Sequence, residues 1–296
     1  LNAGAGVINL NGNVTGSGTL ALQNNTAASG AVNFNANVNL PSVTTFAQPY
    51  AVNFNGSTTT FSNAATFNNT NGLGLGDNSA DSVTFGGGIT NTASTTTINS
   101  TFGTTNDNIT LAGVTLTGNT TITAGTGTIA LGAITGNFAL NLSSTTGSTL
   151  NGAVNINSLT ATSSTTTINT AAITTVGTQA YQNVSLSTGT SLASTNSAIS
   201  FTGTVNGAQS LAINAGTANV TFGGVVGGGT ALTTLTMNGT GTTNINGGAV
   251  TTTGAQTYGA VSLGAATALN AGAGNITLGA VTGNTNSLNL NSTNTT

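Results

Sequence analysis

A long-range repeat is the feature of this sequence that most restricts its fold. The stretch from Thr165 to Phe201 returns at Thr242 to Leu278, so that every position number rises by the same amount (242 − 165 = 77). Matched positions keep their apolar character, as in Leu192 and Leu269. We call this the 77-residue repeat. A fixed period of this kind is typical of architectures in which successive units stack on one another.

Short strands are indicated throughout the chain. An apolar residue, a small polar residue and a second apolar residue follow one another many times, with Gly or Asn nearby to form turns. Examples are Val32-Asn33-Phe34, Val52-Asn53-Phe54, Val83-Thr84-Phe85, Ile109-Thr110-Leu111, Val184-Ser185-Leu186, Val220-Thr221-Phe222 and Val261-Ser262-Leu263. No segment shows a sustained apolar stripe of helical period, so the sequence predicts essentially no helix.

Repeated short strands and tight turns without helices predict an all-β protein, a single elongated parallel β-solenoid (β-helix). Coils of about 20–25 residues would give roughly 12–14 turns, stacked at the strand spacing of about 4.8 Å. Inward Val, Ile, Leu and Phe would stack between coils, while outward Thr, Ser and Asn would form ladders. We expect residues 1–296 to form one continuous solenoid.

One signature marks the repeat most clearly. A branched apolar residue and two threonines are followed by Gln-x-Tyr, and this pattern holds the only three tyrosines of the chain. The pairs are Gln48 and Tyr50, Gln179 and Tyr181, and Gln256 and Tyr258. Exposed tyrosines could stack on carbohydrate, but a fixed place in a repeat favours a structural role at a coil corner.

A second similarity joins distant parts of the chain. The letters Leu-Asn-Ala-Gly-Ala-Gly begin at Leu1 and return, unchanged, beginning at Leu269 (269 − 1 = 268). The sequence also begins at Leu1 rather than Met. These features lead us to expect a segment of a longer repetitive polypeptide.

Charge is almost absent, and this excludes several classes of function. The chain has no lysine, arginine, histidine or cysteine, and only three acidic residues. Nucleic-acid binding needs cations to neutralise phosphate, and zinc or copper sites need His or Cys ligands. Catalysis on β-helices needs carboxylate clusters, usually with Arg or Lys. We therefore expect neither an enzyme nor a cofactor, and no apolar run long enough for membrane insertion occurs.

The aspartates offer one weak candidate for a metal site. Asp77 and Asp81 are close in sequence, and Gly74 to Asn78 vaguely resembles the turns of calcium-binding nonapeptide repeats. Those repeats depend on tandem copies, whereas this segment occurs once. The favoured interpretation is a solvated loop in which an aspartate caps its own turn.

Sequons of the form Asn-x-Ser/Thr are frequent. They include Asn13, Asn24, Asn55, Asn68, Asn108, Asn119, Asn141, Asn183, Asn219, Asn238, Asn275 and Asn291. Asn108, Asn119, Asn183, Asn219 and Asn275 are the candidate glycosylation sites, since sugars could solubilise an uncharged surface. Several sequons fall inside predicted strands, where outward ladder residues are the alternative interpretation.

Threonine tracts raise a further alternative. Thr95-Thr96-Thr97 and Thr165-Thr166-Thr167 could belong to a flat ice-binding face on a solenoid. However, the long repeat separates equivalent tracts by several coils, and no Thr-x-Thr motif recurs on every coil.

The repeats resemble those of a known group. The Gln-x-Tyr-x-x-Val-x-Leu element, together with residues 274–278 and 220–224, is similar to repeats of filamentous-haemagglutinin-like large exoproteins, bacterial β-strand-repeat adhesins. The resemblance covers most of the chain, best from about residue 160 onward. It implies a right-handed β-helix that is secreted or surface-anchored, as in adhesins and biofilm proteins.

These observations predict a structural role. We expect a β-solenoid segment of an extracellular or cell-surface bacterial protein that acts in adhesion, biofilm matrix or surface-fibre assembly. Its partner would be itself, through filaments or continuation of the same solenoid, because only Pro41 and Pro49 could interrupt edge pairing. The alternative is a ligand-binding solenoid with a flat face for ice or for host or matrix glycans.

Overall fold

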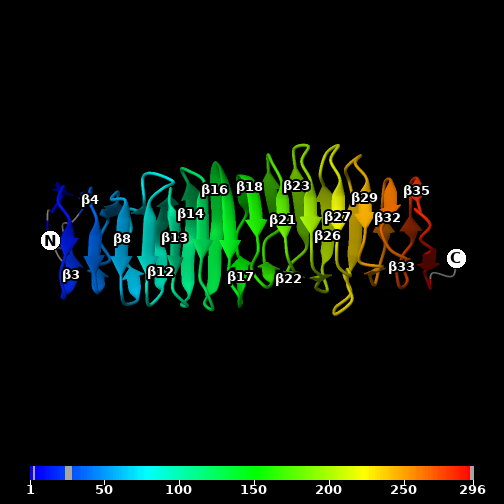
Figure 1. The fold of residues 1–296 in the computed structure, drawn as a ribbon, viewed down its shortest axis with the longest axis horizontal. Coiled ribbons are helices and arrows are strands. Elements are labelled where there is room, and N and C mark those ends of the chain that lie inside the picture. Colours follow the sequence, from blue (N-terminus) through cyan, green and yellow to red (C-terminus); the bar gives the residue numbers. More distant parts are fainter. Residues whose placement is uncertain (3, 24–28, 294–296) are drawn as a thin grey trace. The chain divides into compact units, whose positions relative to one another are not determined.

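The computed structural model describes residues 1–2, 4–23 and 29–293 of the chain. The described residues contain no helix, about 54% of the structure is strand, and the strands form about 14 turns of parallel β-solenoid. The predicted fold class is therefore confirmed. The chain divides into two compact units, Leu1–Thr149 and Leu150–Thr296, which are described in turn (Figure 1).

The first unit is built from short strands, because apolar and polar residues alternate over only a few positions before each turn. Its strands are β1 (Val7–Leu10), β2 (Val14–Thr15), β3 (Thr19–Leu22), β4 (Ala31–Phe34), β5 (Val38–Leu40), β6 (Ser42–Thr45), β7 (Ala51–Phe54), β8 (Thr58–Phe61), β9 (Ala65–Phe67), β10 (Leu73–Leu75), β11 (Ser82–Phe85), β12 (Ile89–Ile98), β13 (Thr101–Thr104), β14 (Ile109–Leu116), β15 (Thr120–Thr123), β16 (Thr128–Ser143) and β17 (Gly147–Leu150).

Three walls of parallel strands enclose the core of the first unit. Wall A contains β1, β4, β7 and β10, wall B begins with β2, β5 and β8, and wall C with β3, β6 and β9. The longer strands β12 and β14 turn a corner and contribute to walls C and A in succession. Each strand pairs with the corresponding strand of the next coil, so that Val7 pairs with Ala31, and Ala31 pairs in turn with Ala51.

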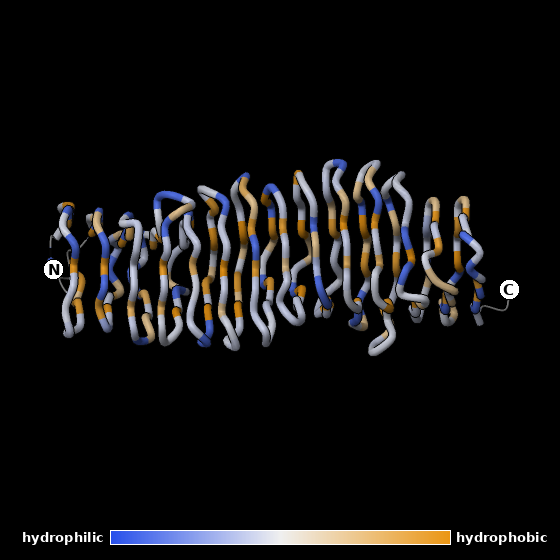
Figure 2. Tube along the Cα trace, in the orientation of Figure 1, coloured by the Kyte–Doolittle hydropathy of each residue, from blue (hydrophilic) through white to orange (hydrophobic). Residues whose placement is uncertain are grey.

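Stacked phenylalanines fill much of this core. The rings of Phe34 and Phe54 stack at 5.0 Å between centroids, and those of Phe61 and Phe85 at 5.4 Å. All four side chains are completely buried. Stacking of identical residues between coils fills the narrow interior and adds ring–ring attraction to the burial of apolar surface. Figure 2 shows the alternation of apolar and polar positions along the coils.

The second unit follows the same plan. Its strands are β18 (Val154–Ala161), β19 (Thr166–Ile168), β20 (Ala172–Thr175), β21 (Gln179–Tyr181), β22 (Val184–Leu186), β23 (Thr190–Ser194), β24 (Ile199–Phe201), β25 (Val205–Asn206), β26 (Ser210–Asn214), β27 (Val220–Phe222), β28 (Thr234–Met237), β29 (Thr243–Ile245), β30 (Ala249–Thr251), β31 (Gln256–Thr257), β32 (Val261–Leu263), β33 (Thr267–Asn270), β34 (Ile276–Thr277), β35 (Val281–Thr282) and β36 (Leu288–Asn291).

The walls of the second unit are defined by its pairing ladders. Wall D runs from the end of β18 through β21, β24, β27, β29 and β32 to β35. Wall E runs from the start of β18 through β20, β23, β26, β28 and β31 to β34. Wall F runs through β19, β22 and β25, then Val226, then β30, β33 and β36. Inside wall D, Phe201 stacks between Tyr181 and Phe222.

Candidate functional site

Two of the three Gln-x-Tyr pairs form the same buried hydrogen-bond network. In β21 the hydroxyl of Tyr181 donates to Oε1 of Gln179 (2.9 Å), and Nε2 of Gln179 donates to the carbonyl oxygen of Ala193 (2.7 Å). At β31 the hydroxyl of Tyr258 donates to Oε1 of Gln256, also over 2.9 Å. Both glutamines are completely buried. These tyrosines are therefore packed and hydrogen-bonded inside the solenoid, as expected for a structural role, and do not form an exposed stacking platform.

The first copy of the signature is different. Tyr50 is completely buried, but its hydroxyl donates to the carbonyl oxygen of Leu22 (3.0 Å) and accepts the N–H of Phe46 (3.1 Å). Gln48 is half-buried in a turn, because Pro49 follows it and cannot donate a ladder hydrogen bond. Burial raises the pKa of the Tyr50 hydroxyl above its ordinary value. The local sequence therefore preserves the tyrosine position but not the glutamine network.

The 77-residue repeat does not correspond to a whole number of turns. Tyr181 belongs to wall D, whereas the equivalent Tyr258 immediately follows β31 of wall E. From β21 to β31 the chain passes eleven strand positions, counting Val226, which at three per turn is three full turns and two further walls. Equivalent strands shift in the same sense throughout: β20 of wall E matches β30 of wall F, and β22 of wall F matches β32 of wall D.

This rotation limits what the long repeat can build. Outward side chains that are equivalent in the repeat face different sides of the second unit, so the repeat does not assemble one flat face of identical residues. A flat array can arise only from neighbouring coils, where ladder partners such as Thr167 and Ser185 lie side by side. The repeat instead gives equivalent features to different walls.

The aspartate pair forms a capped turn. Oδ2 of the buried Asp81 accepts the backbone N–H groups of Asp77 and Asn78, each at 3.0 Å. Asp77 is exposed, and partial burial together with the neighbouring Asp81 carboxylate raises its pKa above the ordinary value. The cap matches the interpretation favoured from the sequence.

The described residues hold no group of three or more His, Cys, Asp or Glu side chains that could bind a metal ion. Asp77 and Asp81 supply two carboxylates, whereas a calcium site takes about six to eight oxygen ligands, so the pair alone does not complete a calcium site. Among the residues that the structure describes, no helix is long and apolar enough to span a bilayer.

The candidate glycosylation sites connect neighbouring coils. The side-chain oxygen of Asn108 accepts the N–H of Thr128 (2.9 Å), and that of Asn119 accepts the N–H of Ala139 (3.0 Å). Asn219 makes the same contact with Thr242 at 3.0 Å. These side chains are exposed just before strands, and each accepts a backbone N–H of the following coil.

The side-chain amide of Asn183 both accepts and donates a hydrogen bond. Its Oδ1 accepts the N–H of Thr204 (2.9 Å), while its Nδ2 donates to the carbonyl oxygen of Ser164 (2.7 Å). A glycan on Nδ2 would replace one of its two hydrogens, so the bond to Ser164 would need the other. Asn275 is exposed in the turn before β34, and the sequon at Asn24 lies outside the described residues. Glycosylation itself remains a prediction.

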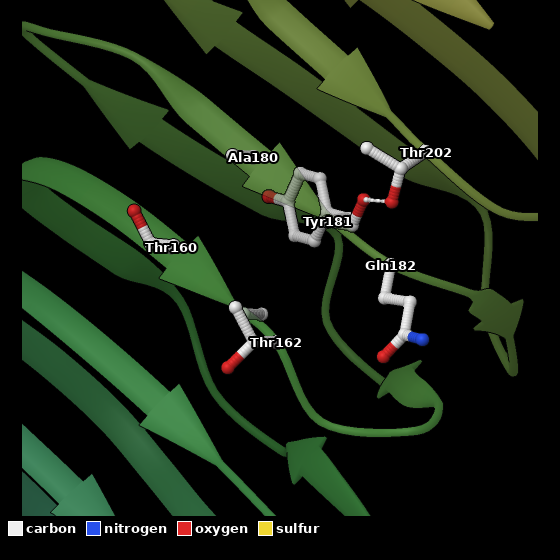
Figure 3. A pocket seen from close by; sticks show the side chains of 7 residues that line it. Thr160, Thr162, Ala180, Tyr181, Gln182 and Thr202 are labelled. Atoms are coloured by element: carbon white, nitrogen blue, oxygen red, sulfur yellow. Dashed lines mark hydrogen bonds between the residues drawn. The ribbon is translucent and has the colours of Figure 1, made fainter. Parts of the chain in front are cut away.

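A shallow hollow of about 350 Å³ opens beside the first Gln-Tyr pair of the second unit. Its lining residues are Thr160, Ala161, Thr162, Ala180, Tyr181, Gln182 and Thr202 (Figure 3). With its amide nitrogen toward them, Gln182 donates to the carbonyl oxygens of Thr162 and Ser163. The lining has no acid, base or nucleophile activated by a neighbour, so it does not support catalysis.

The threonine tracts are only partly exposed. Thr96 and Thr166 are completely buried in the interior. Thr97 stacks on Thr115 of the next coil, and Thr167 stacks on Ser185. The tracts therefore contribute outward residues at alternate positions and do not form a broad threonine face.

Sequence reasoning missed a surface array in the first unit. Asn9, Asn33 and Asn53 form one column on wall A, and Asn11, Asn35 and Asn55 form a second column beside it. We call these six residues the asparagine patch. Its signal is an Asn-x-Asn motif at the same wall position in three successive coils, which becomes visible once the coil lengths are known.

The first and last described coils have strands with one partner each. In the described residues β1, β2 and β3 pair with β4, β5 and β6, while β34, β35 and β36 pair with β31, β32 and β33. Six large apolar side chains of the described residues are exposed, and four of them lie in these two coils. Those four are Leu1, Val7, Val281 and Leu290.

Comparisons with protein families, with curated proteins and with solved structures found no match for this chain. The resemblance to filamentous-haemagglutinin-like exoproteins therefore remains a prediction from the repeat motifs.

Proposed function

We propose that this β-solenoid is a structural segment of a secreted bacterial surface or extracellular filament protein, and that it associates end to end with further copies of itself. Adhesion, biofilm matrix and surface-fibre assembly are the roles that such a segment would serve, following the resemblance of its repeats. The observation that carries the proposal is the parallel solenoid itself, about 14 turns in which each strand pairs with the next coil, in a chain that has no lysine or arginine to discourage further strand pairing.

Open strand edges favour pairing with another strand unless something prevents it. Soluble proteins usually block such edges with lysine, proline or bulges. Neither lysine nor arginine occurs in this chain, and its two prolines, Pro41 and Pro49, lie outside β1–β3 and β34–β36. Exposed Val7 and Val281 add apolar surface that a stacked coil would bury.

The two edge coils also match each other in sequence. The offset that relates Leu1 to Leu269 also places Ile8 of β1 on Ile276 of β34, and Leu20 of β3 on Leu288 of β36. The first coil of a second copy would therefore present the same apolar pattern to the last coil as a neighbouring coil does within the chain. Such a head-to-tail contact does not close and generates a filament.

Electron microscopy and sedimentation of the 296-residue chain test this proposal. We expect filaments whose length increases with protein concentration. The variant Val7→Lys places a charge on the exposed edge strand β1 and should shorten or abolish them. The matched control is Val176→Lys, since Val176 is similarly exposed (54% against 58%) but lies in a turn after β20.

Isolated monomers at every concentration would rule out end-to-end association. Equal filament lengths for Val7→Lys and Val176→Lys would show that the edge of β1 is not the contact. Circular dichroism of both variants verifies that the strands still form.

A further inference from the structure

The asparagine patch consists of two hydrogen-bonded ladders that run across three coils. In the first column, Nδ2 of Asn33 donates to Oδ1 of Asn9 and Nδ2 of Asn53 donates to Oδ1 of Asn33, both at 2.8 Å. In the second column, Asn35 donates to Asn11 (2.8 Å) and Asn55 donates to Asn35 (3.0 Å). The ladders fix six amides in one orientation.

These ladders leave hydrogen-bonding capacity directed outward. A carboxamide has two N–H hydrogens and two oxygen lone pairs. Each ladder bond uses one N–H of one asparagine and one lone pair of the next, so every asparagine keeps at least one N–H and one lone pair. Asn9, Asn11 and Asn35 are exposed, while Asn33, Asn53 and Asn55 are half-buried. The patch therefore presents ordered donors and acceptors at a fixed spacing, about 4.8 Å between coils and about 7 Å between columns.

Glycines define the end of the patch. The next coil has Gly74 in the column of Asn53, and a Cβ at Gly74 would approach Oδ1 of Asn53 to 2.6 Å. Gly76 follows on the same strand face with a φ of 78°, a conformation that favours glycine. The ladders stop at these glycines, just before the capped turn of Asp77.

From this geometry we infer that the asparagine patch is a lateral docking surface for the same patch of a second copy. Two such patches have the same ladder spacing, and the donors of one can meet the acceptors of the other. None of the six side chains is charged, so two copies meet without like-charge repulsion. Asparagine ladders that face each other across paired sheets are a known means of tight β-sheet association.

The size of the patch sets how the contact would work. Three coils and two columns cover on the order of 200 Å² on each copy, far below the ~800 Å² per partner of a stable interface. A single pair of chains would therefore bind weakly. Many copies in a row would multiply the contact through avidity, so the inference rests on the proposed filament and predicts that filaments bundle side by side.

A bead assay tests the lateral contact separately from filament growth. The chain has no lysine, so its amino-terminal amine is its sole primary amine and permits coupling of the chain to beads in one orientation. The Leu1 nitrogen lies against β3 of wall C, where it donates to the carbonyl oxygen of Ala21 (2.7 Å). A bead coupled there obstructs the open edge of the first coil and suppresses end-to-end stacking, while the patch on wall A stays displayed. We expect beads coated with the wild-type chain to clump, in a manner insensitive to NaCl.

The test variant is Asn33→Asp with Asn35→Asp, which puts two negative charges on the middle coil. Like charges that face each other disfavour the contact, so clumping should fall by at least about tenfold at pH 7. The matched control is Asn155→Asp with Asn157→Asp, the same Asn-x-Asn spacing around β18 in the second unit. At about pH 2.5, below the ordinary aspartate pKa of about 3.9, the patch variant should clump again.

Dispersed wild-type beads, unchanged clumping of the patch variant or equal loss in the control variant would each overturn the inference. If clumping of the patch variant recovers at low pH, the variant is folded. If clumping does not recover although circular dichroism shows that the strands are intact, the result counts against the patch. In electron microscopy, single filaments that never bundle would overturn lateral docking alone, whereas missing filaments would overturn end-to-end stacking.

Discussion

The hydroxyl of Tyr181 lies 2.9 Å from Oε1 of Gln179 and donates a hydrogen bond to it inside the solenoid. Tyr258 and Gln256 repeat this contact on a different wall. Removing either hydroxyl leaves a buried amide oxygen without its donor, at a cost of about 1–3 kcal/mol. Thermal melts of Tyr181→Phe and Tyr258→Phe should show similar, clear losses of stability.

The double variant Gln179→Leu with Tyr181→Phe provides the control. If the pair acts as a unit, the double variant should lose less stability than the sum of the losses of Gln179→Leu alone and Tyr181→Phe alone. The reason is that both hydrogen-bond partners are removed together. A neutral Tyr181→Phe would show that the hydroxyl bond does not contribute to stability.

The fold could be predicted from the sequence because each strand carries its own signal. Val220-Thr221-Phe222 and similar triplets specify which residues point inward, and the structure buries Val220 and Phe222 as expected. Parallel stacking then follows, since the repeat lacks helices that could cover a flat sheet.

The wall on which each repeat lies could not be predicted. Its assignment depends on counting every strand position, including Val226, which makes only isolated bridges and has no strand pattern of its own. The asparagine patch was hidden for the same reason, because the two coils that separate its three Asn-x-Asn motifs differ in length. Gln48 differed from the other glutamines because Pro49 removes a ladder donor beside it.

Asparagines at coil corners should stabilise the stack through their side-chain oxygens. Asn108 accepts both the N–H and the hydroxyl of Thr128 at 2.9 Å. Asn108→Ala should lower stability by about 1 kcal/mol, since the N–H that begins the next coil loses its acceptor. Asn108→Asp retains the accepting oxygen and should therefore lose less stability than Asn108→Ala, as measured by denaturant titration. Equal losses would contradict the assigned role.

Close backbone approach leaves no room for a side chain at Gly132 in the first unit. A Cβ at Gly132 would lie 1.6 Å from the carbonyl oxygen of Ala112, whereas a Cβ at Gly18 would meet nothing within 4 Å. Gly132→Ala should therefore cost about 3 kcal/mol or more through backbone displacement, and Gly18→Ala should stay within about 0.5 kcal/mol of wild type. Denaturant midpoints measure both, and a tolerated Gly132→Ala would contradict the coil spacing.

Acid should favour the capped turn slightly. Partial burial and the Asp81 carboxylate raise the pKa of Asp77 in the folded state. The folded state then holds the Asp77 proton more tightly, so its contribution is present below the unfolded pKa and is lost as pH rises through the folded pKa. Because Asp77 is exposed, the effect is small. Asp77→Asn should remove this contribution to the difference in melting temperature between pH 3 and pH 6, and a difference that Asp77→Asn leaves unchanged would contradict it.

Alkaline unfolding should depend on the buried tyrosines. Burial raises the pKa of Tyr181 and of Tyr258 above the ordinary value near 10. Their contribution to stability is complete below that value and is lost as pH rises toward the folded pKa, because the unfolded chain ionises first. Tyrosinate absorbance should therefore appear together with the loss of strand circular dichroism. Tyrosinate that forms near the ordinary pKa with the strands intact would show that these hydroxyls are accessible to solvent and that the buried networks of Gln179 and Gln256 open in the folded protein.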